Sequence, residues 1–291
     1  MKNIGFVGLG NMGFFMSKNL SFNNYNVNGY DIDQTLFEKL IKFKVNQTLS
    51  IDQISTKNDI IITMLPNGKI VKEVWTSLLS KISPNTLLVD CSTIDIETTK
   101  YLHDEAEKKD VLSLDAPVSG GTVGAENGTL TFMVGGKKEA YNKMLPLFDI
   151  MGNKSILCGK AGSGQATKMC NNLLLAITMF GLGEAIKLAN SQSLNMEKFY
   201  EVLSTSTASC WALNNYTPIK GVGAQSPADN HFKPGFSSQL MLKDLSLALS
   251  AANNANLNLD FGNRILEKYK EHVNGNKGHL DFSDIINWFY W

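Results

Sequence analysis

The stretch NIGFVGLGNMG (residues 3–13) joins a short apolar run to a glycine-rich turn. Gly8, Gly10 and Gly13 have the spacing G-x-G-x-x-G. Residues 3–8 predict a buried strand, and apolar residues recur at helical spacing over 11–23. A strand, a glycine turn and a helix in this order are typical of a dinucleotide-binding βαβ unit.

Further strand and helix patterns follow this first unit. Apolar runs at 25–31, 59–65, 86–92, 111–117 and 129–136 predict strands, and 70–82 and 96–110 have helical spacing between them. Strands that alternate with helices favour a parallel sheet covered on both faces. We therefore expect an α/β fold with a Rossmann-type, doubly wound, mainly parallel sheet.

The pattern changes near residue 163. Residues 164–193 carry helical spacing for nearly thirty residues, and three more helical patterns follow. Between them, 214–236 is rich in loop-forming residues, and so long a loop is often functional. We expect a nucleotide-binding domain over 1–162 and an all-helical domain for substrate binding and oligomerisation over 163–291, joined by a long helix.

Composition narrows the classes of partner. The 291 residues include 27 Lys and Arg and 27 Asp and Glu, so the formal net charge is zero. We therefore expect no nucleic-acid partner and no anionic membrane surface. The chain contains no run of eighteen apolar residues and starts without a signal or transit pattern. These features favour a soluble cytoplasmic protein, or a mitochondrial one if a transit segment is missing. The four Cys and four His have no ligand spacing, so we expect no metal.

The glycine turn has a chemical interpretation. Gly8 permits a tight turn, Gly10 lets the backbone approach a pyrophosphate, and Gly13 permits close packing of helix on strand. The amides of this loop, which also contains Leu9, Asn11 and Met12, face the phosphates at the helix N-terminus.

Asp31 ends the second predicted strand, about twenty residues further on. Its carboxylate would accept hydrogen bonds from ribose hydroxyls and repel a 2′-phosphate, and no Arg follows in DIDQT. We therefore expect NAD as the cofactor in preference to NADP. The alternative is a structural glycine turn with an exposed Asp.

Two later strand ends belong to the same sheet edge. In TMLPN (63–67), Leu65 and Pro66 are candidates to line the nucleotide; in DCSTI (90–94), Ser92 and Thr93 are candidates for the nicotinamide side. Ser and Thr at a strand end are more often plain turn residues.

Two motifs suggest a substrate site. In DAPVSGG, Ser119, Gly120 and Gly121 offer a hydroxyl and unobstructed amides to a small carboxylate; the alternative is a flexible loop. In GSGQATKMCNN (162–172), Lys168 and Asn172 are four residues apart and share a helix face. Lys168 is either a proton-transfer group or a lysine whose head reaches water.

These motifs resemble the β-hydroxyacid dehydrogenase family over essentially the whole chain. The resemblance rests on FVGLGNMG with Asp31, DAPVSGG, TFMVGG and GSGQATKMCNN. It implies oxidation of a 3-hydroxy acid with a nicotinamide cofactor, and a homodimer or homotetramer. It also implies Lys168 as general acid/base, Asn172 as the residue that orients substrate, and Lys243 near nicotinamide and substrate. By the same resemblance, Ser119, Gly120 and Gly121 bind the substrate carboxylate.

Within the family, the long segment 209–249 is similar to the branch that oxidises 3-hydroxyisobutyrate to methylmalonate semialdehyde in valine catabolism. Two alternatives stay open: NAD(P)H-dependent reduction of tartronate or succinic semialdehyde, and a non-catalytic nucleotide-binding module. One departure is Phe15, where the family usually has proline.

Overall fold

The computed structural model describes residues 2–290 of the chain. They form two compact units, Met1–Lys168 and Met169–Trp291, and the boundary falls inside one long helix, α8 (Ser163–Ser191). Each unit has its own hydrophobic core.

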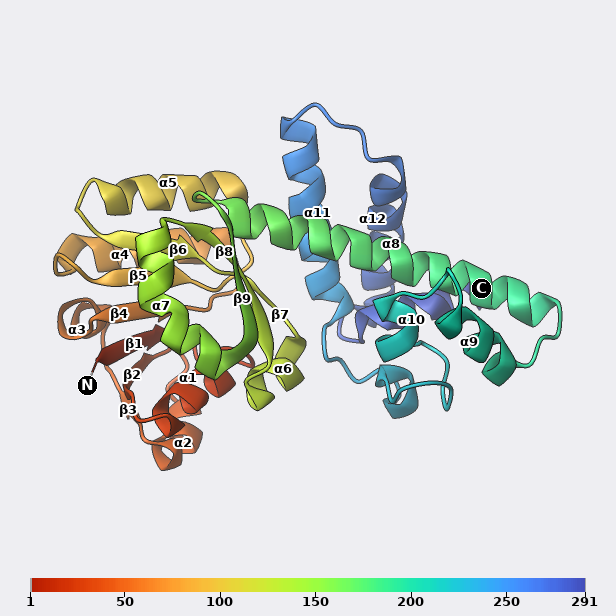
Figure 1. Ribbon diagram of the computed structural model, residues 1–291, viewed down its shortest axis with the longest axis horizontal. Helices are drawn as coiled ribbons and strands as arrows, with labels where there is room; N and C mark the ends of the chain where they lie inside the picture. Colours follow the sequence, from red (N-terminus) through yellow and green to blue (C-terminus); the bar gives the residue numbers. More distant parts are fainter. Residues whose placement is uncertain (1, 291) are drawn as a thin grey trace. The chain divides into compact units, whose positions relative to one another are not determined.

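The first unit is built on a nine-stranded sheet in the order β3-β2-β1-β4-β5-β6-β8-β7, with β9 paired to β8 (Figure 1). The strands are β1 (Asn3–Val7), β2 (Asn26–Tyr30), β3 (Val45–Gln47), β4 (Ile60–Thr63), β5 (Leu87–Asp90), β6 (Leu112–Asp115), β7 (Val118–Ser119), β8 (Leu130–Gly136) and β9 (Gly152–Gly159). Strands β1 to β6 pair in parallel, and β8 is antiparallel to β6 and β7. The predicted Rossmann-type, mainly parallel sheet is confirmed.

Helices cover both faces of this sheet, as its continuous apolar strands require. They are α1 (Gly13–Phe22), α2 (Leu36–Leu40), α3 (Ile51–Lys57), α4 (Gly68–Lys81), α5 (Ile96–Glu107), α6 (Gly121–Asn127) and α7 (Lys138–Met151). In β4, Ile60 and Ile62 join the core under α1 and α7, whereas Ile61 joins the core under α3, α4 and α5. This alternation is the pleat of a strand buried on both faces.

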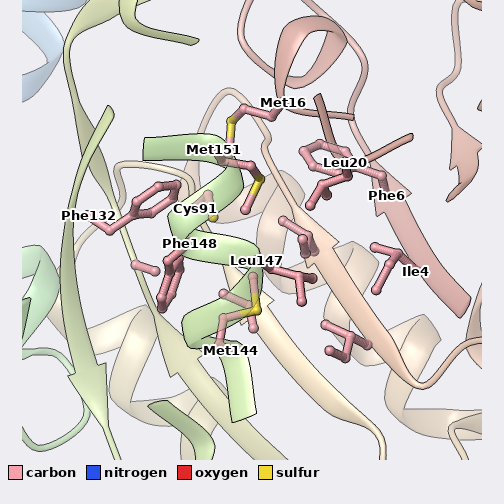
Figure 2. Packing of buried hydrophobic residues seen from close by; sticks show 14 of the residues in the cluster. Ile4, Phe6, Met16, Leu20, Cys91, Phe132, Met144, Leu147, Phe148 and Met151 are labelled. Carbon is pink, nitrogen blue, oxygen red and sulfur yellow. The ribbon is translucent and has the colours of Figure 1, made fainter. Parts of the chain in front are cut away.

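Helix α7 fills the first of these cores. Its Met144, Leu147, Phe148 and Met151 point toward the strands, and Phe148 lies 4.6 Å, centroid to centroid, from Phe132 of β8 (Figure 2). All five side chains are fully or almost fully buried. At roughly 25 cal/mol per Å² of apolar surface, each large side chain of this kind contributes about 2 kcal/mol to the burial term.

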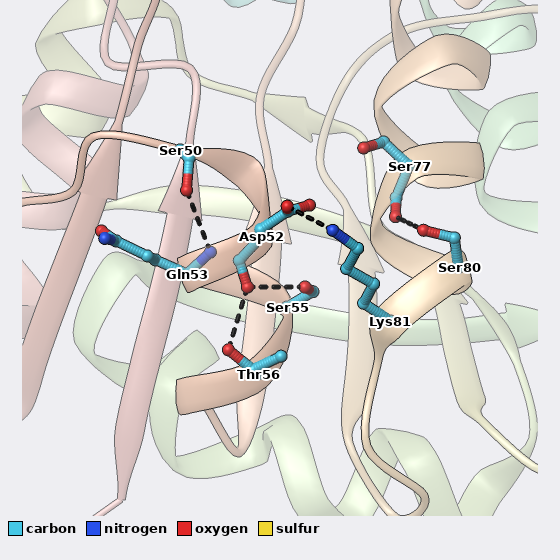
Figure 3. Close-up of polar contacts among 8 residues, drawn as sticks. All are labelled: Ser50, Asp52, Gln53, Ser55, Thr56, Ser77, Ser80 and Lys81. Carbon is cyan, nitrogen blue, oxygen red and sulfur yellow. Dashed lines mark hydrogen bonds and ion pairs between the residues drawn. The ribbon is translucent and has the colours of Figure 1, made fainter.

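Helices α3 and α4, on the other face of the sheet, carry short polar contacts. Ser50 caps α3 by accepting the Gln53 amide hydrogen at 3.3 Å, and Lys81 at the end of α4 forms an ion pair with Asp52 (Figure 3). Ser80 donates to the backbone oxygen of Ser77 in the same last turn of α4. Both charged side chains of the ion pair are half exposed, so it contributes at most about 1 kcal/mol.

The second unit is helical, as predicted. After α8 come α9 (Met196–Thr205), α10 (Trp211–Tyr216), α11 (Ser238–Asn254) and α12 (Asp260–His272), with 3₁₀ turns at Pro227–Asn230 and Phe282–Tyr290 and a π turn at Val273–Lys277 (Figure 1). The core of this unit includes Met179 and Ile186 of α8, Met241 and Leu245 of α11, and Tyr269 of α12.

Helix α8 is also the one described helix that has the length and apolar composition of a membrane span. The core helix of a water-soluble protein has the same two properties. Ala176, Met179, Leu182 and Ile186 of α8 are buried inside the helical unit. We therefore interpret α8 as the core helix of that unit.

One carboxylate binds residues near both ends of the predicted loop-rich stretch 214–236. Asp281 accepts the Tyr216 hydroxyl at 2.9 Å, the Gly235 amide at 3.0 Å and the Phe236 amide at 3.1 Å. Burial raises the pKa of Asp281 above its ordinary range, although hydrogen bonds from Ser283, Phe236 and Tyr216 act in the opposite direction. These hydrogen bonds attach the stretch to the C-terminal segment that contains Asp281.

Candidate functional site

The glycine-rich turn lies between β1 and α1, as predicted. Gly8 has φ +92, and a Cβ there would lie 2.2 Å from the Met64 oxygen; a Cβ on Gly13 would lie 1.9 Å from the Gly8 oxygen. Both glycines are thus required by the packing of the chain on itself. A Cβ on Gly10 would meet no atom within 4 Å. Gly10 therefore has no packing reason in this structure, and its role in the approach of a pyrophosphate stays a prediction.

Helix α1 starts without a side-chain cap from its N-cap residue. Asn11 lies in the turn before the helix, and Met12 occupies the cap position without a side-chain hydrogen bond to the helix amides. Phe15, where the family usually has proline, lies in a regular helix and packs edge-on against Phe14. The departure at this position leaves the helix intact.

Asp31 is brought to the glycine turn. Its Oδ2 accepts the Leu9 amide hydrogen at 2.7 Å, and its Oδ1 accepts the Asp33 amide hydrogen at 2.9 Å. A carboxylate has about four acceptor positions, so two stay available to ribose hydroxyls. The structure therefore places Leu9 and Asp31 together, 22 residues apart in sequence.

The ends of β4 and β5 also meet. The Leu65 amide donates to the Ser92 hydroxyl oxygen at 2.8 Å, and the Ser92 hydroxyl donates to Asp90 Oδ1 at 2.6 Å. Thr63 donates to the same oxygen at 2.7 Å. Pro66 and Thr93 flank these contacts in sequence, at the carboxyl edge where doubly wound sheets bind ligands.

Asp90 itself is buried and was not predicted as a site residue. Burial raises its pKa to about 6, against the hydrogen bonds from Ser92 and Thr63, and the neighbouring Asp115 carboxylate adds to the rise. Its sequence DCSTI gives no signal that the carboxylate points inward, because strand-end Asp residues are common.

The motif DAPVSGG forms a corner. Ser119 ends β7 and α6 begins at Gly121. Gly120 and Gly121 have φ values of +128 and +61, which explains two consecutive glycines. The role of Ser119, Gly120 and Gly121 as a carboxylate cradle stays a prediction.

Lys168 and Asn172 both lie on α8, one turn apart, and both are buried, with 7% and 1% of their surface exposed. The Asn172 amide donates to Asp244 Oδ2 at 2.6 Å, and its oxygen accepts the Asn171 side-chain amide at 2.9 Å. Lys243 Nζ lies 3.6 Å from Asp244 Oδ1. The structure thus gathers Asn172, Lys243 and Asp244 within the helical unit.

Asp244, which follows Lys243 in the sequence LMLKDLSLA, is not among the site residues predicted from sequence. It is 3% exposed and is the hydrogen-bond partner of a predicted substrate-orienting residue. Its position next to Lys243 is a local feature, but it does not indicate Asn172, 72 residues away, as the hydrogen-bond partner. Among residues 2–290, no three His, Cys, Asp or Glu side chains gather in a way that could hold a metal ion.

A Rossmann-type sheet with a glycine turn, followed by a long helix that carries the buried Lys168 and Asn172 and continues into a helical unit, defines a nicotinamide-dependent dehydrogenase. Family models agree: residues 3–159 match the "NAD binding domain of 6-phosphogluconate dehydrogenase", and residues 162–289 match the "NAD-binding of NADP-dependent 3-hydroxyisobutyrate dehydrogenase". The chain belongs to the 3-hydroxyisobutyrate dehydrogenase family, whose members are β-hydroxyacid dehydrogenases that act on a CH–OH group.

The chain is similar to the following three relatives over nearly its whole length. The 3-hydroxyisobutyrate dehydrogenase of Mycobacterium tuberculosis, solved with L-serine, is 38% identical with a TM-score of 0.95, and the match covers 99% of both chains. The mitochondrial 3-hydroxyisobutyrate dehydrogenase of Drosophila melanogaster is 39% identical over 98% of this chain and 89% of the relative. An NAD-dependent L-serine dehydrogenase of Pseudomonas aeruginosa is 38% identical over 99% of this chain and 98% of the relative.

Proposed function

We propose that the chain oxidises 3-hydroxyisobutyrate to methylmalonate semialdehyde with NAD, as a step of valine catabolism. The observation that carries this proposal is the full-length similarity to the Mycobacterium and Drosophila relatives, both named for this activity. The match to the Mycobacterium relative covers 99% of both chains, and in this chain Asp281 binds the loop 214–236 through Tyr216 and Gly235.

The residues around the glycine turn fit a dinucleotide. Gly8 to Gly13 would hold the pyrophosphate, because the turn is tight and a Cβ on Gly10 would face open space. Asp31 has acceptor positions for the ribose hydroxyls and a charge that disfavours a 2′-phosphate. We assign the remaining cofactor contacts to Leu65, Pro66, Thr93 and Lys243. Bound NAD supplies the acceptor for the hydride of the carbinol carbon.

The protein's part in the reaction is binding and proton transfer. We assign Ser119, Gly120 and Gly121 to the substrate carboxylate, which fixes one end of a 3-hydroxy acid. Lys168 takes the proton of the substrate hydroxyl and returns it in the reverse reaction, a role worth about 10²–10⁴-fold in rate. Asn172, held by Asp244 at 2.6 Å, orients the hydroxyl toward Lys168.

Oxidation of L-serine is the second candidate. L-serine is also a 3-hydroxy acid, and it appears in the name of the Pseudomonas relative and beside the solved Mycobacterium enzyme. Reduction of a short semialdehyde with NADPH is less well supported, because we expect the Asp31 carboxylate to repel a 2′-phosphate.

We further propose that residues 1–162 form the NAD-binding domain and 163–291 the domain for substrate binding and oligomerisation, in a homodimer or homotetramer. Inside the cell the protein would act in the cytoplasm, or in the mitochondrion as the name of the Drosophila relative indicates for that protein.

Initial rates of NAD reduction test the function. We would assay the purified protein with 3-hydroxyisobutyrate, L-serine, glycerate (the reduced form of tartronate semialdehyde) and related hydroxy acids, with NAD and with NADP. The proposal predicts the highest kcat/KM for 3-hydroxyisobutyrate with NAD. A higher kcat/KM for L-serine would support the second candidate, and NAD binding without turnover of any acid would favour a non-catalytic module.

A further inference from the structure

The start of α8 is fixed by a carboxylate from the sheet. Asp115, the last residue of β6, is 1% exposed. Its Oδ1 accepts the Gly162 amide hydrogen at 2.8 Å, and its Oδ2 accepts the Gln165 amide hydrogen at 2.9 Å. His103 Nε2 also lies 3.3 Å from Oδ1. The carboxylate thus satisfies two amides at a helix start that would otherwise be unpaired, and its charge is favourable there.

Two glycines make room for this carboxylate. A Cβ on Gly164 would lie 2.7 Å from Asp115 Oδ2 and 2.3 Å from the Met133 oxygen. A Cβ on Gly135 of β8 would lie 2.4 Å from Asp115 Oδ1. Since real Cβ atoms do not approach so closely, both positions require glycine for Asp115 to reach the helix.

Gln165 forms a second tie. This side chain is fully buried in the first turn of α8. Its Nε2 donates to the Ser92 backbone oxygen at 2.7 Å, and its Oε1 accepts the Ile94 amide hydrogen at 3.1 Å. Since the Ser92 hydroxyl also accepts the Leu65 amide, the helix start is joined to the ends of both β4 and β5.

Lys168 follows Gln165 by three residues. At 1.5 Å per residue the two lie roughly 4.5 Å apart along the helix axis, less than one turn. The start of α8 therefore sets the position of Lys168 along the helix axis and the direction in which its side chain leaves the helix. We propose that Asp115 and Gln165 are positioning residues, which hold Lys168 in register with the sheet edge that carries Leu65 and Thr93.

This inference rests on the proposed function of Lys168 as the general acid/base. A misplacement of about 1 Å is enough to cost on the order of 10²-fold in rate. Loss of positioning lowers kcat, because proton transfer depends on geometry, and it leaves KM for the hydroxy acid nearly unchanged. A purely structural role would lower thermal stability and leave kcat per folded molecule unchanged.

The test uses two variants and a matched control in the full-length protein. Asp115→Asn replaces one acceptor oxygen by a donor, and Gln165→Met removes both side-chain hydrogen bonds at similar volume. The control is Asn58→Leu, which removes a buried amide that donates to the Ile54 oxygen at 2.8 Å and accepts from Asn28 at 2.7 Å, away from α8. We would measure kcat, KM, the Kd of NAD and the melting temperature of each.

We expect both variants to lose roughly tenfold or more in kcat with less than about threefold change in KM, whereas Asn58→Leu loses stability but keeps kcat. Unchanged kcat in Asp115→Asn and Gln165→Met would overturn the inference; if one of them fails to fold, the kcat of the other decides. Turnover by the wild type and its loss in Lys168→Ala test the proposed function separately. Absence of wild-type turnover would overturn both proposals, and unchanged kcat in the two variants beside an active wild type overturns only this one.

Discussion

The buried carboxyl of Asp90 makes stability depend on pH. Burial raises its pKa from 3.8 to about 6, so the folded protein keeps a proton that the unfolded chain releases. Below the unfolded value both states are protonated and folding carries no penalty. As pH rises through the window from about 4 to about 6, the unfolded state ionises first, and the stabilisation from the protonated form is lost. A rise of about two pKa units corresponds to roughly 3 kcal/mol.

Asp90→Asn tests this. The amide resembles the protonated acid in shape and charge, and its oxygen still accepts from Thr63 and Ser92. Because the unfolded carboxyl is already more than half ionised at pH 4, we expect the free energy of unfolding of the variant, relative to the wild type, to rise by about 2 kcal/mol of this total between pH 4 and pH 7. Urea unfolding followed by circular dichroism at each pH measures it. Asp149→Asn, at an exposed position on α7, controls for the loss of charge. A difference between wild type and Asp90→Asn that stays constant across this range would refute the reasoning.

Three further predictions concern the site. Gly10→Ala should fold normally, because a Cβ there meets no atom within 4 Å, and it should weaken NAD binding by about tenfold or more in a fluorescence titration. The control Gly181→Ala, where a Cβ on α8 also meets no atom within 4 Å, should leave the Kd of NAD unchanged. Equal Kd values for the two variants would count against the glycine turn as the cofactor site. Asp244→Ala leaves the Asn172 amide without its partner, so kcat for the hydroxy acid should fall by about tenfold while NAD binding persists; unaltered kcat would remove Asn172 from the mechanism. Asp31→Asn removes the charge that opposes a 2′-phosphate, so the ratio of KM values for NADP and NAD should fall, and an unchanged ratio would contradict its role in cofactor choice.

The fold could be predicted from sequence where the signal is local. Strands β4 and β5 are unbroken apolar runs, and the glycine turn has a fixed spacing. Strand β9 escaped prediction because it lies at an edge of the sheet, where GNKSILCG is largely not buried and needs no apolar run. Strand β3 has three residues, too few for a pattern. Helix α7 was missed, and Pro146 inside it is a residue that normally argues against a helix.

The candidate site also contains some residues that the sequence predicts and others that it does not. Asp31 could be predicted because it stands at a fixed distance from the glycine turn. Asp115 and Asp244 could not, because their partners are 47 to 72 residues away in sequence and nothing local marks those pairings. Which carboxylate accepts which amide depends on the folded sheet and helices.

The variant Lys168→Ala gives the most direct test of the proposed role of Lys168 in proton transfer. Steady-state rates of the wild type and of Lys168→Ala should be measured with 3-hydroxyisobutyrate and L-serine, together with the Kd of NAD. We expect NAD reduction by the wild type with the higher kcat/KM for 3-hydroxyisobutyrate, and a loss of about 10²–10⁴-fold in kcat on removal of Lys168 with the NAD Kd unchanged. A Lys168→Ala variant that turns over at the wild-type rate, or a wild type that oxidises neither acid, would contradict it.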